Sequence, residues 1–282
     1  MKKVIDGKKL AEKIKDEVAK EVVKLKGKRP NLAIILVGER DDSVIYVKKK
    51  TVEAKKVGID THFYKCSVKI NEREIFDMIN HLNKDELIDA ILVQLPLPRE
   101  FDTDGIVMAI DPNKDVDCFH PDNVQALIKN YNNLKISSPV FSSVFYILKD
   151  LDYNIKGKNV CIISNSDIFG YSLVSVFKQK GAKAETIKPM SKELVNKTKK
   201  ADILITAAGK KHFIKKDMVK KDAIVIDVGI IKEGNKVYGD VDFKDVKDRA
   251  SFITPVPGGV GPMTIAMLFR NTLELYKKRH NK

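Results

Sequence analysis

The sequence has no tryptophan and only three cysteines among its 282 residues. Cys66, Cys118 and Cys161 are far apart and lack the paired CxxC spacing of a zinc or redox site, so we expect unpaired thiols in a reducing compartment. No apolar run approaches the roughly 20 residues that span a bilayer, and the opening MKKVIDGKKL contains no apolar signal core. These absences predict a cytoplasmic protein that has no membrane partner.

Arginine is also scarce. Only seven of the 52 basic residues are Arg, although the formal net charge is +14. The lysines are scattered over the predicted helices and interleaved with acidic residues, a pattern that indicates solvated helix faces. Bidentate phosphate and base contacts favour Arg, and the chain has no Arg-rich arm, zinc finger or aromatic RNA-binding platform. We therefore expect no nucleic-acid partner.

The apolar pattern predicts alternating helices and strands. Helices are expected over residues 8–26, 42–57, 72–82, 170–180 and 263–278, and strands over residues 32–37, 61–66, 88–93, 159–163, 184–187, 202–206 and 223–228. Several strands are short, continuous apolar runs, which are typical of strands buried on both faces. The alternation predicts an α/β fold with parallel sheets covered by helices.

Two segments after the strand at 88–93 are candidate sites, because α/β proteins place chemistry in loops after parallel strands. The first is LPLP (95–98), whose prolines end the strand. The second is the polar loop at 111–123, which contains Asp111, Asp115, Asp117 and His120. It lacks the calcium-loop pattern, and its carboxylates can simply cap and shape the turn, so we expect no metal site.

The predicted helix that starts near residue 42 carries a second candidate. Ser43, Tyr46, Val47 and Lys50 share one face, with Tyr46 and Lys50 one turn apart. In a cleft, burial would lower the pKa of Lys50 toward that of a proton shuttle. On a surface, the same pair would be a solvated Lys beside a packed Tyr. The spacing alone leaves both interpretations open.

The strand at 159–163 leads through SNSDIFG (164–170) into a helix, which could seat a phosphate on helix N-terminal amides. Only Gly170 remains of a glycine-rich fingerprint, and Glu185 lies where an acidic group could hold a ribose hydroxyl. A plain connection between strand and helix is the alternative. Near the C-terminus, the Pro- and Gly-rich segment TPVPGGVGPMT (254–264) predicts a rigid bend that brings backbone close to a ligand.

Together, these segments resemble one enzyme family. The matching motifs are SVIYVKKK (43–50), VQLPLP (93–98), DPNKDVDCFHP (111–121), DVGI (227–230), GDVDF (239–243) and TPVPGGVGPMT (254–264). They resemble, in order and separation, those of the methylenetetrahydrofolate dehydrogenase/methenyltetrahydrofolate cyclohydrolase family, commonly a single bifunctional chain of the FolD type. The resemblance covers essentially the whole chain.

The resemblance implies two α/β domains flanking a cleft, the second a Rossmann-like parallel sheet. Residues 1–136 and 264–282 would form the catalytic folate-binding domain, and residues 137–263 the nucleotide-binding domain. The family oxidises methylenetetrahydrofolate to methenyltetrahydrofolate with NADP or NAD and hydrolyses the product to formyltetrahydrofolate. Tetrahydrofolate derivatives, a homodimer and a place in one-carbon metabolism and purine biosynthesis are implied as well.

The resemblance also implies residue roles. Lys50 would be central to hydrolysis, with Tyr46 beside it, Gln94 orienting it and Asp117 holding the pterin. A neutral Lys50 suits a cationic methenyl substrate, because it can take a proton from water without adding charge. The implied substrate-binding residues are Tyr46, Lys50, Gln94, Leu95, Asp117, Pro257, Gly258, Gly259 and Pro262. The implied cofactor-binding residues are Ser164, Asn165, Ser166, Gly170 and Ile230.

The chain departs from the family around the expected cofactor. Ser164 and Asn165 replace a usual glycine and a frequent arginine, and SSPVF (137–141) replaces a Pro-Cys-Thr-Pro loop. Pro189 and Met190 stand where a Ser followed by Arg or Lys often contacts the cofactor phosphate. We expect NADP, with NAD as the other candidate. The alternatives are a cyclohydrolase with a decayed or NAD-preferring nucleotide site, and a folate-binding scaffold that lacks activity.

Overall fold

The computed structural model describes residues 3–38, 41–234 and 236–280. By contacts within the chain, it divides into two units. The three-stranded unit comprises Glu12–Ala126, Leu134–Pro139 and Ile265–Lys282; the five-stranded unit comprises Met1–Ala11, Leu127–Asn133 and Val140–Thr264. The family resemblance placed residues 1–136 and 264–282 in one domain and residues 137–263 in the other. By contacts, residues 3–11, 127–133 and 264 group with the five-stranded unit, and residues 137–139 group with the three-stranded unit. No helix in the described ranges is long and apolar enough to cross a membrane.

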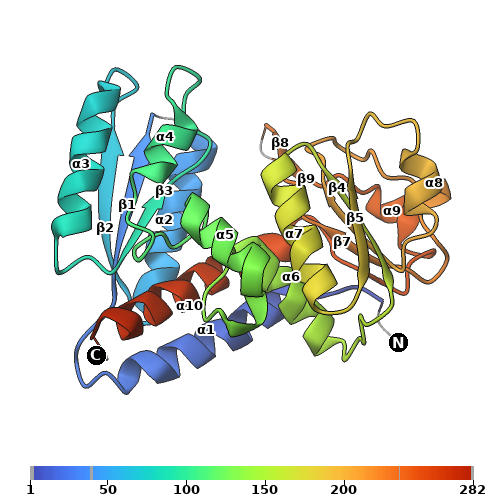
Figure 1. Cartoon of the computed structure of the whole chain (residues 1–282), viewed down its shortest axis with the longest axis horizontal. Coiled ribbons are helices and arrows are strands. Elements are labelled where there is room, and N and C mark those ends of the chain that lie inside the picture. The colour runs from blue at the N-terminus through green and yellow to red at the C-terminus, as the bar shows by residue number, and fades with distance from the viewer. Residues whose placement is uncertain (1–2, 39–40, 235, 281–282) are drawn as a thin grey trace. The chain divides into compact units, whose positions relative to one another are not determined.

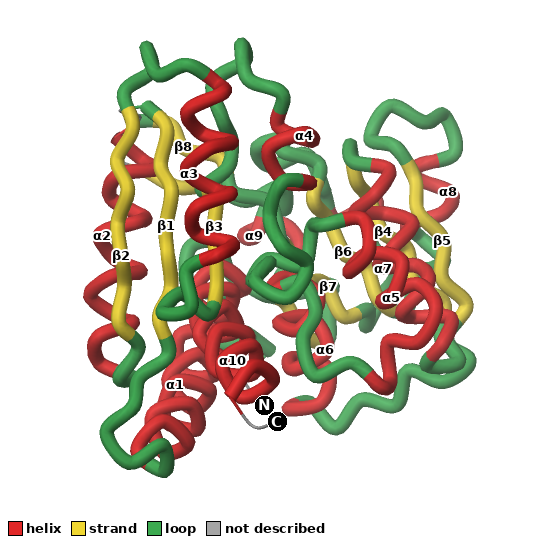
Figure 2. The backbone as a smooth tube through the Cα atoms, turned by 60° about the vertical axis from the view of Figure 1, so that its left-hand side comes forward, coloured by secondary structure: helices red, strands yellow, loops and turns green. Residues whose placement is uncertain are grey.

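The three-stranded unit is built on a parallel sheet of order β2-β1-β3 (Figure 2). Its strands are β1 (Asn31–Val37), β2 (Asp60–Cys66) and β3 (Ala90–Val93). Its main helices are α2 (Asp41–Lys56), α3 (Glu72–Lys84) and most of α1 (Gly7–Val23) and of α10 (Val260–His280). Alternate residues of β1 serve two cores, because successive side chains of a strand point to opposite faces. The β1 strand is therefore apolar almost throughout.

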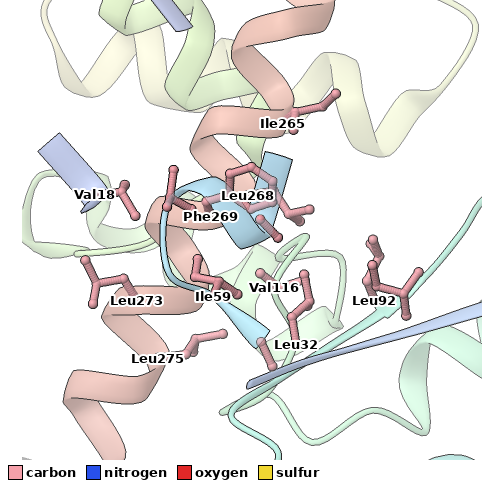
Figure 3. Close-up of a cluster of buried hydrophobic side chains, with 14 of the residues drawn as sticks. Val18, Leu32, Ile59, Leu92, Val116, Ile265, Leu268, Phe269, Leu273 and Leu275 are labelled. Atoms are coloured by element: carbon pink, nitrogen blue, oxygen red, sulfur yellow. The ribbon is translucent and has the colours of Figure 1, made fainter. Parts of the chain in front are cut away.

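One of these cores packs Leu32 and Ile34 of β1 with residues from α1, α2 and α10, among them Leu268 and Phe269 (Figure 3). The other packs Ile35 against Ile75 and the rest of the apolar face of α3. A capping box at Asn71 and Glu74 starts α3. Further along the chain are α4 (Thr103–Met108), α5 (Pro121–Asn130) and the short 3₁₀ helix η1 (Tyr131–Asn133).

The five-stranded unit contains a parallel sheet of order β10-β7-β6-β4-β5, of which β4, β5 and β7 are labelled in Figure 1. The strands are β4 (Asn159–Ser164), β5 (Lys183–Ile187), β6 (Ile203–Ala207), β7 (Ile224–Asp227) and β10 (Phe252–Ile253). Consecutive strands β5 and β6 pair on opposite sides of β4, so the strand order reverses there. In open α/β sheets, ligands bind outside the carboxyl ends of the strands at such a switch point.

Helices and a hairpin complete this unit. They are α6 (Pro139–Asp150), α7 (Asp167–Gln179), α8 (Leu194–Thr198), the 3₁₀ helix η2 (Lys216–Met218), the hairpin strands β8 (Ile231–Glu233) and β9 (Lys236–Tyr238), and α9 (Phe243–Val246). Residues of β4, β6, β7 and β10 on one sheet face form a core with side chains near α8, η2 and α9. On β4, the intervening residues Val160 and Ile162 are also buried.

The α/β expectation with parallel sheets is confirmed, and the expected elements agree with the observed ones to within a few residues at most ends. The start of one helix and the end of one loop are corrected. The α7 helix begins at Asp167 rather than Gly170 because Ser166 accepts a hydrogen bond from the N–H of Phe169 and caps it. The α5 helix begins at Pro121, inside the expected loop, because proline is favoured in a first helical turn.

Candidate functional site

The carboxyl edge of the three-stranded sheet brings Lys50 and Gln94 together. Lys50, on α2, is only 7% exposed, and its Nζ donates to Gln94 Oε1 at 3.0 Å. Gln94 directly follows β3, and its backbone N–H donates to the carbonyl of Ile35. Its side-chain Nε2 donates to the carbonyl of Leu95 at 2.7 Å, which fixes the amide with its oxygen toward the lysine amine. Backbone groups therefore hold Gln94 in the orientation that meets Lys50.

Asp117 is the third member of the group formed with Lys50 and Gln94, and it acts on Lys50 through its charge. Burial lowers the pKa of Lys50, and the negative charge of Asp117 partly opposes that shift. Burial raises the pKa of Asp117 to about 6, against the attraction of Lys50 and with a further rise from Asp115. The Asp117 side chain still keeps part of its surface exposed. The site thus holds an amine biased toward its neutral form beside a partly accessible carboxyl group.

The loop that carries Asp117 is held to the sheet on its N-terminal side. Asp115 forms a parallel bridge with Ile91 of β3, and its buried carboxylate accepts from the His120 N–H and from Asn123 Nδ2. The buried Lys114 donates to the carbonyls of Leu82 and Asp85, at the end of α3. Asp115 therefore shapes the loop, which is the structural role considered for these aspartates above.

Asn271, on α10, anchors the peptide next to Asp117. Its buried Nδ2 donates to the carbonyl of Val116 at 2.9 Å and to that of Ser137 at 2.8 Å. On the other side of Asp117, Cys118 has a φ of 57°, a left-handed backbone that non-glycine residues seldom adopt. The backbone around Asp117 is thus defined by a side chain more than 150 residues away in sequence.

The structure brings Lys50, Gln94, Leu95 and Asp117 into one unit. The backbone of Tyr46 lies on α2, one turn before Lys50, but the side chains of Tyr46 and Ser43 lie outside the described residues. Among the residues that the structure describes, no three His, Cys, Asp or Glu side chains are grouped so as to hold a metal ion.

A second site-like region lies at the carboxyl end of β4, in the five-stranded unit. The Ser164 hydroxyl donates to the Ser166 carbonyl and accepts from the Ser166 N–H, so it stabilises the turn itself. Asn165 Nδ2 donates to the carbonyl of Ala208, after β6, at 2.5 Å. A Cβ on Gly170 would lie 2.4 Å from Thr186 Oγ1, so glycine is needed there for α7 to pack on β5.

Glu185 does not reach that region, contrary to the expectation from its position along the chain. It pairs in register with Cys161, in the middle of β4, and its carboxylate forms an ion pair with Lys197 at 2.9 Å. It lines a cavity of about 400 Å³ together with Asn159, Val160, Cys161, Lys178, Lys183, Ala184, Lys197, Lys200 and Ala201. Asn159 and Lys183 are the first residues of their strands, so this cavity lies toward the amino end of the sheet. The suggested contact between Glu185 and a ribose is therefore wrong.

Two buried carboxylates join the loops after β6, β7 and β9. Asp240 accepts from Thr206 Oγ1, the Ala208 N–H and the Lys210 N–H. Asp227 accepts from the backbone N–H groups of Gly229, Asp240 and Val241. Burial raises the pKa of Asp227 to about 7 against these hydrogen bonds.

The Pro- and Gly-rich bend at 254–264 belongs to the five-stranded unit. A Cβ on Gly7 would lie 1.9 Å from the carbonyl oxygen of Gly259, so α1 starts in direct contact with this bend. Gly258 has a φ of 104°, which only glycine adopts readily. Pro257 is exposed and Pro262 partly exposed, and Ile230 is 59% exposed. The bend thus presents backbone and ring surface that is rigidly supported.

Sequence reasoning did not single out Asn271, Asp240 or Lys188, which contacts the β4–α7 turn. A polar residue in the apolar stripe of the last helix was the available signal for Asn271. For Asp240 the signal was a second acidic motif, GDVDF, beside DVGI. For Lys188 the signal was its position directly after the predicted strand at 184–187, because residues that follow parallel strands are candidate ligand contacts.

A parallel sheet whose order reverses at β4, with a capped helix directly after that strand, defines a Rossmann-like α/β protein. The model of the tetrahydrofolate dehydrogenase/cyclohydrolase NAD(P)-binding domain matches residues 139–280, and that of the family's catalytic domain matches residues 5–117. The chain belongs to the tetrahydrofolate dehydrogenase/cyclohydrolase family.

Individual relatives match over nearly their whole length. The bifunctional protein FolD of a Nitratiruptor species is 45% identical, with 98% of each chain covered. The crystal structure of the bifunctional FolD enzyme from Campylobacter jejuni has a TM-score of 0.92 at 40% identity, covering 98% of this chain and 99% of that one. The Trypanosoma brucei enzyme, solved with NADP and an inhibitor, has a TM-score of 0.92 at 33% identity, covering 98% and 97%.

Proposed function

We propose that this chain oxidises methylenetetrahydrofolate to methenyltetrahydrofolate with NADP and hydrolyses that product to formyltetrahydrofolate, and that Lys50 is its central catalytic residue. The observation that carries the proposal is the buried Lys50 amine, oriented by Gln94 and placed near Asp117 in a chain of this family. The family's NAD(P)-binding domain model also matches residues 139–280, which favours both activities over hydrolysis alone.

In the hydrolysis, Lys50 acts as the proton acceptor. A neutral amine has two N–H donors and one lone pair; one N–H donates to Gln94 Oε1, which aims the lone pair elsewhere. Water attacks the methenyl carbon and loses a proton to that lone pair, while the ring nitrogen takes up the electron pair of the C=N bond of the cation. When this adduct collapses, its hydroxyl loses a proton to solvent and becomes the formyl carbonyl, the bond from carbon to the ring nitrogen breaks, and that nitrogen takes the proton back from Lys50. A neutral Lys50 also adds no charge beside a cationic substrate.

Asp117 and the bend at 254–264 orient the folate. Asp117 in its ionised form accepts hydrogen bonds from the pterin amino group and ring N–H. Leu95, Pro257, Gly258, Gly259 and Pro262 supply backbone and apolar contacts to the substrate, and Tyr46 lies on α2 one turn from Lys50. These roles follow the family motifs residue by residue.

The residues after β4 fit a dinucleotide. Gly170 permits the close packing of α7 on β5, and α7, capped by Ser166 at the Phe169 N–H, begins directly after β4, where N-terminal amides of a helix can bind a phosphate. Ser164, Asn165, Ser166, Gly170 and Ile230 would hold the cofactor. When bound, NADP supplies the electron acceptor for the oxidation. The chain's own contribution is to bind and orient the cofactor.

The assembly and setting belong to the same proposal. We infer a homodimer in the cytoplasm, without nucleic-acid or membrane partners, whose formyltetrahydrofolate product serves one-carbon metabolism and purine biosynthesis. Strand β5 is an edge of its sheet within the described chain, and such an edge can pair with a second copy. Light scattering coupled to size-exclusion chromatography should give a mass of two chains; a mass of one chain would contradict the dimer.

The Lys50→Ala variant tests the central role. Hydrolysis of methenyltetrahydrofolate, followed by the loss of its absorbance, should fall by about 100-fold or more, because the proton acceptor is removed. Lys49→Ala is the matched control, because Lys49 is an exposed neighbour on the same helix. Circular dichroism should show that both variants are folded. Hydrolysis near the wild-type rate in Lys50→Ala would refute the assigned role.

A further inference from the structure

Lys188 occupies the carboxyl end of β5, next to the turn that leads from β4 into α7. Ile163 of β4 and Ile187 of β5 are paired in register, so Lys188 follows at the level of Ser164. Its exposed Nζ donates to the carbonyl of Asn165 at 2.8 Å and pairs with Asp167 at 2.7 Å. A cation is therefore held against the first residues of the proposed dinucleotide site.

A second lysine approaches the same segment from the loop after β6. Lys210 Nζ lies 2.9 Å from the sulfur of Met190, two residues after Lys188. Asn165 links the β4–α7 turn to the loop after β6 through the carbonyl of Ala208. Three carboxyl-end segments thus meet here, and the charged side chains in these contacts are two lysines and the carboxylate of Asp167.

The chemistry of this position selects between dinucleotides. In Rossmann-like sheets, the end of the strand beside the fingerprint strand faces the adenosine ribose, where an acidic group binds the 2′-hydroxyl of NAD and a basic group accepts the 2′-phosphate of NADP. Glu185 pairs with Lys197 and lines the cavity toward the amino end of the strands. The residue at the carboxyl end is Lys188, a cation.

We propose that Lys188 binds the 2′-phosphate of NADP and gives this chain its preference for NADP over NAD, with Lys210 as a second cation. The inference rests on the proposed dehydrogenase function. The family often has basic or hydroxyl side chains at the positions of Asn165, Pro189 and Met190, and these three residues supply no positive charge. The proposal assigns that positive charge to Lys188 instead. The ion pair with Asp167 is exposed on both sides and screened by water, so a phosphate with two charges can replace it.

Binding of two small probes isolates the 2′-phosphate. Isothermal titration of the full chain with 2′,5′-ADP and with 5′-AMP measures what that phosphate adds. We expect the wild type to bind 2′,5′-ADP more tightly than 5′-AMP. Lys188→Gln should weaken 2′,5′-ADP binding by about tenfold, the loss of one charge-assisted hydrogen bond, and leave 5′-AMP unchanged. Asp167→Asn should tighten 2′,5′-ADP, because a repelling carboxylate is removed.

Lys183→Gln is the matched control, because Lys183 is an exposed lysine at the opposite end of β5. It should change neither affinity. In turnover, Lys188→Gln should lower kcat/KM with NADP relative to NAD and leave methenyltetrahydrofolate hydrolysis at the wild-type rate. Equal wild-type affinities for the two probes, or an unchanged difference in Lys188→Gln, would overturn the assignment to Lys188. A wild type that binds 2′,5′-ADP more tightly but reduces neither NADP nor NAD would instead overturn the proposed dehydrogenase activity.

Discussion

Lys50 and Asp117 illustrate how burial and charge act on a pair of side chains. Burial alone favours the uncharged form of each, and the opposite charge of the partner favours the charged form. For both groups burial is the larger effect, so the pKa of Lys50 falls and that of Asp117 rises. The lowered pKa of Lys50 favours the neutral amine that the proposed hydrolysis needs, whereas the raised pKa of Asp117, about 6, still leaves that carboxyl group mostly ionised at neutral pH.

The raised pKa of Asp117 predicts how folate binding depends on pH. The ionised carboxylate accepts the pterin donors, and its pKa is about 6. Binding through Asp117 is therefore complete well above that pKa and weakens as the pH falls through it. Steady-state hydrolysis measured from about one pH unit below the pKa to about two units above it should show KM rising toward acid.

The variant Asp117→Asn provides the comparison, since an amide does not titrate in this range. Its KM should be higher than that of the wild type on the alkaline side and should not rise further toward acid. If the variant keeps the wild-type pH profile, the acid-side rise comes from another group and the role of Asp117 in binding is wrong.

At the scale of an element, α10 supports the chemistry through Asn271. Its two N–H groups satisfy the carbonyls of Val116 and Ser137, and the side chain is 3% exposed. Asn271→Ala leaves two buried carbonyls without these donors. We expect urea unfolding to show a loss of about 1–3 kcal/mol in the free energy of unfolding, with a higher KM for folate because Asp117 follows Val116.

Arg270→Ala is the matched control for this substitution. Arg270 is the exposed neighbour on the same helix, so its removal should change the free energy of unfolding little. If Asn271→Ala lowers stability but leaves KM for folate unchanged, Asn271 is structural and does not position Asp117.

The sequence predicted those helices and strands that one clear local pattern specifies. The strands β1 and β4 are continuous apolar runs, and α3 has both a regular apolar face and a capping box. The hairpin of β8 and β9 was missed because its residues are mostly polar or exposed. The α7 helix begins earlier than its apolar pattern because a Ser166 cap, rather than an apolar residue, sets its start.

The site residues likewise fall into those that a local sequence pattern identifies and those that it does not. Lys50, Gln94 and Asp117 lie in motifs whose spacing and family resemblance were visible in the sequence. Asn271 lies far along the chain from its acceptors, and the contacts of Glu185 depend on strand register, neither of which a sequence pattern encodes. Tertiary hydrogen bonds and register therefore had to come from the structure.

At the scale of the whole molecule, the two units have separate cores and carry different parts of the proposed reactions. The apolar cluster around Phe269 belongs to the three-stranded unit, and the cluster around Leu204 belongs to the five-stranded unit. Hydrolysis uses Lys50 in the first of these, whereas oxidation also needs the nucleotide held by the second. Damage confined to the nucleotide-binding loops of the five-stranded unit, away from the bend at 254–264, should therefore separate the two activities.

Asp240→Asn makes that separation testable. The carboxylate accepts from Thr206 Oγ1 and from the Ala208 and Lys210 N–H groups, and an amide turns an NH₂ group toward at least one of these donors. The loop after β6 should lose its position, so NADP binding and dehydrogenase activity should fall. Hydrolysis should stay near the wild-type rate, which also reports that the three-stranded unit is folded. Asp248→Asn, at an exposed position, is the control. A parallel fall of both activities in Asp240→Asn would mean that the two units depend on each other for their folding, because Asp240 has no part in the proposed hydrolysis.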